Sequence, residues 1–142
     1  MPRVSRSALL PYPAAKLFAL VNDVERYPEF LPWCAAAEVI STKPGEMLAA
    51  LVIRRGALSE RFTTRNAYSF PERIEMSLIE GPFERLSGAW QFTTLGEGCK
   101  VELDLEFEYA RGFLHRAIGS AFGRAASSLV DAFCTRARTL YQ

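Results

Sequence analysis

The chain has 142 residues, of which 49% are hydrophobic and 23% charged, values typical of one soluble globular domain over residues 1–142. Lys and Arg number 17 against 16 Asp and Glu; this balance argues against a generic nucleic-acid binder, and we expect no DNA partner. Three cysteines without paired spacing and a single histidine argue against a disulfide framework or a metal site.

The first 30 residues predict one strand followed by two helices. Residues 3–10 alternate enough for a strand, which prolines 11 and 13 then end. Pro13 suits the first turn of a helix over 14–21, whose apolar side chains share one face. Asp23 is expected to cap a short second helix that runs through Tyr27.

From about residue 35 to 110 the hydrophobic period becomes two, which is typical of strands. Turn residues interrupt this pattern at 43–45, 56, 70–71, 81–82 and 96–98. The short connections predict six consecutive strands in an antiparallel meander. The clearest is 101–109, where the odd positions are apolar and the even ones acidic, so one face should be buried. The same alternation places Phe62, Tyr68 and Phe70 together on one face.

The last 30 residues return to a helical period, with one apolar stripe from Leu114 to Leu140. At 1.5 Å per residue such a helix is roughly 40 Å long, enough to lie across the whole sheet. The predicted fold class is therefore α+β, a curved antiparallel sheet that grips one long C-terminal helix.

The segment YPEFLPWC, residues 27–34, is rich in large apolar side chains and holds two prolines, so it predicts a rigid aromatic corner. Either the corner closes one end of the core, or Phe30, Leu31 and Trp33 line a pocket mouth or dock on a partner. Small residues leave a similar choice between close packing and room for an apolar ligand. They are Ala49, Ala50, Gly88, Ala89, Gly119, Gly123 and Ser127.

Residues suited to catalysis are scarce. His115 lacks a nucleophile motif with Ser120 or Cys34. The four nominal zinc ligands, His115, Cys34, Cys99 and Cys134, have no paired spacing. We therefore predict no catalytic residue, no metal and no catalytic cofactor.

Arginine supplies 14 of the 17 basic residues, and Arg54, Arg55, Arg61 and Arg65 fall on two strands that we expect to be neighbours. Either these side chains pair across strands with the acidic stripe at 102–108 or with Glu60, or they form a phosphate-binding patch suited to RNA. Which of Arg54 and Arg55 faces outward is ambiguous, because the residues before them are apolar at both parities.

This order of elements, together with YPEFLPWC, resembles the coenzyme Q-binding, START-like family, which includes bacterial ribosome association toxins. The similarity runs from Val4 to about Leu140 and is supported by the turn at 81–83 and by Phe107, whose strand leads to Phe113. It implies the helix-grip, birch-pollen-allergen-like fold. In that fold a seven-stranded sheet wraps the C-terminal helix and leaves a hydrophobic tunnel between them.

The resemblance implies non-enzymatic binding of ubiquinone, or a similar polyprenyl lipid, as a bound ligand that supports respiration. Trp33, Tyr68 or Tyr109 would offer an N–H or O–H to the quinone carbonyls. The implied ligand-binding residues are Phe30, Leu31, Trp33, Phe62, Tyr68, Phe70, Trp90, Phe107, Tyr109, Ile118 and Phe122.

The same family implies an alternative, a toxin that binds the large ribosomal subunit and blocks its association with the small one. Arg54, Arg55, Arg61 and Arg65 would then contact ribosomal RNA. A polyketide cyclase-like enzyme is the third hypothesis, and it is disfavoured because the inward positions are nearly all apolar. Without a signal peptide or an apolar stretch of about 20 residues, we expect a cytoplasmic protein whose membrane contact would be peripheral to the inner membrane.

Overall fold

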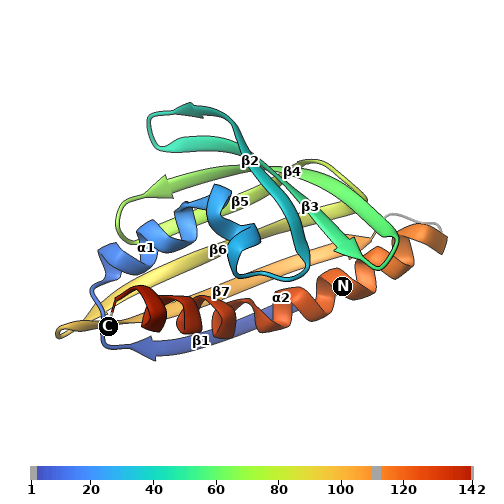
Figure 1. Cartoon of the computed structure of the whole chain (residues 1–142). Helices are drawn as coiled ribbons and strands as arrows, with labels where there is room; N and C mark the ends of the chain where they lie inside the picture. The colour runs from blue at the N-terminus through green and yellow to red at the C-terminus, as the bar shows by residue number, and fades with distance from the viewer. Residues whose placement is uncertain (1–2, 110–112, 142) are drawn as a thin grey trace.

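The computed structural model describes residues 3–109 and 113–141, without the side chains of residues 55 and 113–121. Most of this part of the chain forms one sheet and one long helix, and two short helices follow the first strand (Figure 1). The elements are β1 (Arg3–Leu10), α1 (Ala14–Asn22), the 3-10 helix η1 (Val24–Glu29), β2 (Cys34–Lys43), β3 (Glu46–Arg55), β4 (Leu58–Ser69), β5 (Arg73–Glu80), β6 (Phe83–Leu95), β7 (Gly98–Tyr109) and α2 (Phe113–Leu140).

The described strands form a single antiparallel sheet in the order β1-β7-β6-β5-β4-β3-β2. The sheet curves, and α2 runs along its concave side, with α1 and η1 over another part of the same side (Figure 1). The predicted α+β, helix-grip fold is therefore confirmed. No described helix is long and apolar enough to span a membrane.

The alternation in β7 shows how the sequence produces the core. Val101, Leu103 and Phe107 face inward and are at most 2% exposed. The intervening acidic residues face outward, where Asp104 forms a two-pronged ion pair with Arg3 of the edge strand at 2.9 Å. Each inward side chain therefore packs under α1 and α2, while the outer face stays charged.

The helix α2 contributes a buried stripe spaced by three or four residues: Phe122, Ala126, Val130, Phe133 and Ala137. This is the apolar face that the helical period predicts. Its last predicted member, Leu140, is 49% exposed and so lies outside the core.

Two local predictions are wrong. Asp23 precedes η1 but makes no side-chain capping hydrogen bond. Phe70 lies beyond the end of β4 in the turn before β5, where its side chain is 66% exposed and touches Phe18 edge-on, with ring centroids 5.1 Å apart. The strand alternation that keeps Tyr68 partly buried has ended by residue 70, so Phe70 does not share an inward face with Phe62.

Candidate functional site

An apolar cavity of about 70 Å³ lies between the concave face of the sheet, the corner after α1, and α2. Four of the residues predicted to bind a ligand line it: Trp33, Phe62, Trp90 and Phe122. They come from the corner, β4, β6 and α2, so the curvature of the sheet brings together side chains that are far apart in sequence. The cavity occupies the place expected for a tunnel.

The volume of this cavity determines the size of the molecule that it can hold without displacement of its side chains. Ligand pockets commonly have volumes of about 300–1,000 Å³, whereas one water needs only about 15 Å³. The cavity therefore has room for a few waters, and a ligand with a six-membered ring must displace side chains. The partly exposed lining side chains have most freedom to move, and these are Trp33, Leu51, Met76 and Leu129.

Most of the other predicted ligand residues that the structure describes pack the core and do not line the cavity. Leu31 is 1% exposed, and Phe107 lies edge-on against Phe122 with centroids 5.0 Å apart. Tyr109 contacts Phe107, and Tyr68 lies edge-on to Phe18 at 5.9 Å. Phe70 is on the surface, as described above, and the side chain of Ile118 lies outside the described residues.

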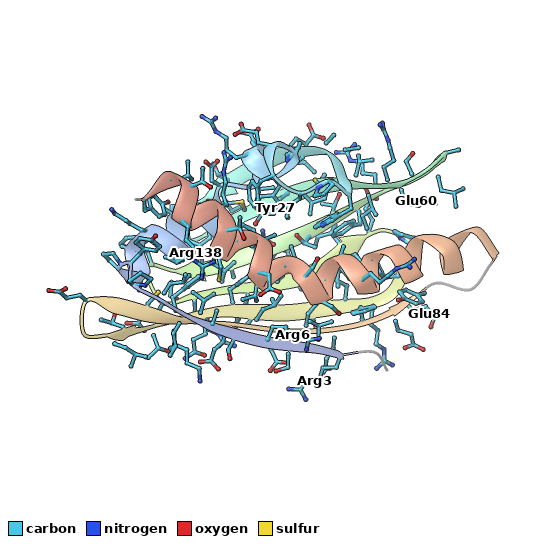
Figure 2. All side chains as sticks on the ribbon, turned by 60° about the horizontal axis from the view of Figure 1, so that its bottom comes forward. Arg3, Arg6, Tyr27, Glu60, Glu84 and Arg138 are labelled. Atoms are coloured by element: carbon cyan, nitrogen blue, oxygen red, sulfur yellow. The ribbon has the colours of Figure 1, made fainter. Side chains whose placement is uncertain are left out.

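The corner at residues 27–34 is fastened to α2 (Figure 2, where Tyr27 of η1 is labelled on the side that faces α2). The buried Tyr27 hydroxyl donates to the carbonyl of Val21, and its ring lies 5.4 Å from that of Phe133. Phe30 packs edge-on to Phe133 at 5.3 Å, beneath the guanidinium of Arg136. Phe30 and Leu31 therefore pack against the core while Trp33 borders the cavity, and binding of a ligand or partner by this corner stays a prediction.

Glu29 completes this attachment by accepting hydrogen bonds from Arg26 at 3.0 Å and from Arg136 at 2.7 Å. The bond from Arg26, reinforced by Arg136, holds the pKa of Glu29 below its ordinary 4.5. A carboxyl whose pKa is lowered on folding stabilises the fold above that ordinary value, and the contribution is lost as pH falls through the folded-state pKa. The Glu29→Gln variant should therefore unfold at lower urea than the wild type at pH 7, and by a smaller margin at pH 3.

Urea unfolding monitored by tryptophan fluorescence at the two pH values measures this difference. Glu97→Gln, on the exposed turn between β6 and β7, is the matched control and should show no such pH-dependent gap. An equal gap for Glu29→Gln at pH 7 and pH 3 would contradict the assigned role of the charge.

Two buried polar side chains, Thr64 and Asn66, also line the cavity, at 9% and 6% exposure. The hydroxyl of Thr64 donates to Oδ1 of Asn66 at 2.8 Å. Sequence reasoning missed both, although the signal was present: they share the parity of Phe62 and Tyr68 on β4, and that face is inward. Among the described residues, the cavity lining is thus apolar apart from this polar pair and the hydroxyl of Tyr27.

The described residues around the cavity offer little for acid–base or nucleophilic chemistry. Tyr27 is the titratable group among those lining it, and burial raises its pKa well above the ordinary value. Burial also raises the pKa of the nearby corner residue Cys34 to about 11, so its thiol stays protonated and weakly nucleophilic at neutral pH. No group of three or more metal-ligating side chains occurs in the described part of the chain.

The small residues divide between the two predicted roles. Ala49 borders the cavity. Gly88 and Gly123 instead mark close packing, since a Cβ at Gly88 would lie 2.4 Å from the carbonyl oxygen of Asp104, and one at Gly123 would lie 3.2 Å from the hydroxyl of Tyr109.

The predicted arginine patch lies on the outer face of two paired strands, as expected. Ile53 points into the core at 0% exposure, so its neighbour Arg54 faces outward, in the same surface as Arg61 and Arg65. Arg61 pairs with Glu38, and Arg65 pairs with Glu46 at 2.6 Å, whereas Arg54 has no ion-pair partner among the described residues. The side chain of Arg55 lies outside the description.

The outer face also carries a shallow depression of about 430 Å³, open to solvent. Small side chains such as Ser77, Ser87 and Ala89 form its floor, and its arginine walls are Arg3, Arg65 and Arg73. Each of these arginines is ion-paired, to Asp104, Glu46 and Glu75 respectively. This hollow is larger than the inner cavity, and its charged walls do not suit an apolar ligand.

Comparisons with known proteins agree with this architecture. A family model described as polyketide cyclase/dehydrase and lipid transport matches residues 10–134. A ribosome association toxin RatA from Pseudomonas aeruginosa is 54% identical over 139 residues, covering 97% of this chain and 96% of the relative. The mitochondrial coenzyme Q-binding protein COQ10 homolog B of Xenopus laevis is 26% identical over 143 residues, covering 96% of this chain and 58% of the relative.

Among solved structures, the Zhui aromatase/cyclase from Streptomyces sp. R1128 superposes with a TM-score of 0.85 at 16% identity, covering 99% of this chain and 96% of that one. Identity at this level shows a shared fold and carries no information on activity.

Proposed function

This chain belongs to the polyketide cyclase/dehydrase and lipid transport family, and within that family we propose that it is a ribosome association toxin. In this role it binds the large ribosomal subunit in the cytoplasm and blocks association with the small subunit, without catalysing a reaction. The observation that carries the proposal is 54% identity to a protein of that name over nearly the whole of both chains. The coenzyme Q-binding relative is only 26% identical, so it gives weaker support to a quinone-binding role for this chain.

The outer face of the sheet supports docking on RNA. Arg54, Arg61 and Arg65 lie on one exposed surface, and a guanidinium fork matches the geometry of a phosphate. Exposed ion pairs such as those of Arg61 and Arg65 contribute about 0–1 kcal/mol, so exchanging a carboxylate for an RNA phosphate costs little. The near-neutral chain can therefore still present a local phosphate-binding surface.

Binding to purified large subunits should be salt-sensitive and should depend on this face. Three phosphate contacts predict that log K falls with log salt with a slope of about −2. The Arg61→Glu/Arg65→Glu double variant should bind at least tenfold more weakly in a co-sedimentation assay, because it replaces attraction to phosphate with repulsion. Overexpression of the wild type, and not of this variant, should deplete intact ribosomes in density gradients.

The control for overall charge is Arg124→Glu/Arg138→Glu, which also reverses two exposed charges but on α2, away from the outer face (Figure 2, where Arg138 is labelled). It should bind like the wild type. An equal loss in both variants would contradict the assigned surface, and wild-type protein that fails to sediment with large subunits would contradict the proposed function itself.

A second candidate function is binding of ubiquinone or a similar polyprenyl lipid, and the apolar inner cavity favours it. Burial of a prenyl tail there would contribute about 25 cal/mol per Å². This role uses the inside of the fold and includes peripheral contact with the inner membrane, so it is compatible with ribosome binding by the outside. A cyclase activity is disfavoured, because the polar pair Thr64 and Asn66 provides neither an acid nor a base.

Solvent extraction of the purified protein followed by mass spectrometry tests this second function. We expect a polyprenyl quinone in the extract, or uptake of added quinone with a shift of tryptophan fluorescence, since Trp33 and Trp90 line the cavity. An empty protein that also fails to take up quinone would contradict it.

A further inference from the structure

Asn66 is the feature of the inner cavity that neither packing nor the proposed docking surface explains. It lies near the middle of the sheet on β4 and is 6% exposed, among lining side chains that are otherwise mostly apolar. An amide in such a place is unfavourable unless its donors and acceptors find partners.

The amide oxygen of Asn66 has a hydrogen-bond partner among the described residues, whereas its nitrogen has none. Thr64 donates its hydroxyl to Oδ1 of Asn66 at 2.8 Å, which satisfies the oxygen and fixes the orientation of the amide plane. Nδ2 makes no hydrogen bond to a described residue, and Asn66 is one of the residues that line the cavity. A cavity-lining amide is therefore left with a donor that has no partner among the described residues.

The strands on either side cannot supply the missing acceptor. Asn66 is paired in register with Met47 of β3 and with Met76 of β5. A thioether is at best a weak acceptor. These two neighbours therefore leave the amide N–H without a strong acceptor, which a molecule inside the cavity could supply.

We propose that Asn66 is the specificity-determining residue of this cavity, and that its amide donates a hydrogen bond to a carbonyl or ether oxygen of an otherwise apolar ligand. Thr64 is the positioning residue that holds the amide in this orientation. The inference rests on the second proposed function, ligand binding in the cavity, and is independent of ribosome binding. It selects ligands that carry an oxygen acceptor over hydrocarbons of the same shape.

Two probes of one bicyclic skeleton, 1-tetralone and tetralin, test this selectivity because they differ in a single carbonyl oxygen. Titration followed by the indole N–H NMR signals of Trp33 and Trp90 reports binding in the cavity itself. The selectivity is the Kd of tetralin divided by the Kd of 1-tetralone. We expect this selectivity to be about fivefold higher for the wild type than for Asn66→Leu, which corresponds to one neutral hydrogen bond. Met76→Leu is the matched control, since it changes an apolar lining residue, and it should leave the ratio unchanged.

The possible results separate this inference from the function on which it rests. If both probes bind and Asn66→Leu leaves the ratio unchanged, the role of Asn66 is overturned while cavity binding stands. If neither probe shifts the indole signals of the wild type, ligand binding in the cavity is overturned, and the inference with it. The Thr64→Val/Asn66→Leu variant removes both members of the pair and should show the same fivefold loss, which covers the case in which the single variant folds poorly.

Discussion

Replacing Phe133 by Ala should lower the free energy of unfolding by about 4 kcal/mol. The side chain is 2% exposed and lies edge-on to three rings, those of Tyr27, Phe30 and Trp90, with centroids 5.2–5.4 Å away. Its removal costs the burial of a full aromatic ring, enlarges the inner cavity, and breaks the contact that holds the corner against α2. Urea denaturation followed by circular dichroism measures the change.

Leu140→Ala provides the comparison on the same helix, because Leu140 is 49% exposed and its truncation should change stability by no more than about 0.5 kcal/mol. A loss below about 1 kcal/mol for Phe133→Ala would show that the corner and α2 are not packed around this ring.

Gly88→Ala, a change of one methyl group, should cost about 3 kcal/mol, near the upper end for overpacking. Gly88 lies within β6, paired in register with Met76 of β5 and Leu105 of β7. A Cβ there would lie 2.4 Å from the carbonyl oxygen of Asp104 and 2.8 Å from Cδ1 of Leu105. The side chain of Leu105 can rotate, but the carbonyl of Asp104 belongs to the backbone of β7, so the two strands would have to separate.

Ser87→Ala is the matched control, one residue away on the exposed outer face, and should stay within about 0.5 kcal/mol of the wild type. Thermal and urea unfolding of both variants decide the matter, and a Gly88→Ala protein as stable as Ser87→Ala would refute the close approach of β6 and β7.

The elements and their faces followed from the sequence, because hydrophobic period and turn residues act locally. The alternation from Val101 to Phe107 needs one buried face, and only β structure provides it. The stripe through Phe122 and Phe133 likewise requires a helix with one side in the core. The corner at residues 27–34 was predictable as rigid from its prolines, but its attachment through Glu29 and Arg136 joins segments that no local pattern connects.

The site was less predictable, because lining a cavity depends on how far facing elements stand apart. Phe107 and Trp90 face the same interior, yet only Trp90 lines the cavity, since α2 lies against Phe107 through Phe122. The predicted lining was based on aromatic residues and therefore omitted Asn66, although its even position on β4 already placed it on the inner face. The sequence predicted that Arg61 and Arg65 could pair with carboxylates. Which glutamates they pair with depends on the register of β2, β3 and β4.

The pairing of β1 with β7 determines at which stage of synthesis the sheet can fold completely. Arg3 contacts Asp104, 101 residues away, and the hydroxyl of Tyr141 reaches the carbonyl of Lys16 across 125 residues. During synthesis β1 emerges before the other strands and stays without its partner until β7 emerges. The helix α2, which fills the concave side, emerges after β7. Such long-range closure favours slow folding, on the order of milliseconds to seconds. The outer face that unites Arg3 with Arg65 and Arg73 therefore forms only after β7 has been synthesised and has paired with β1.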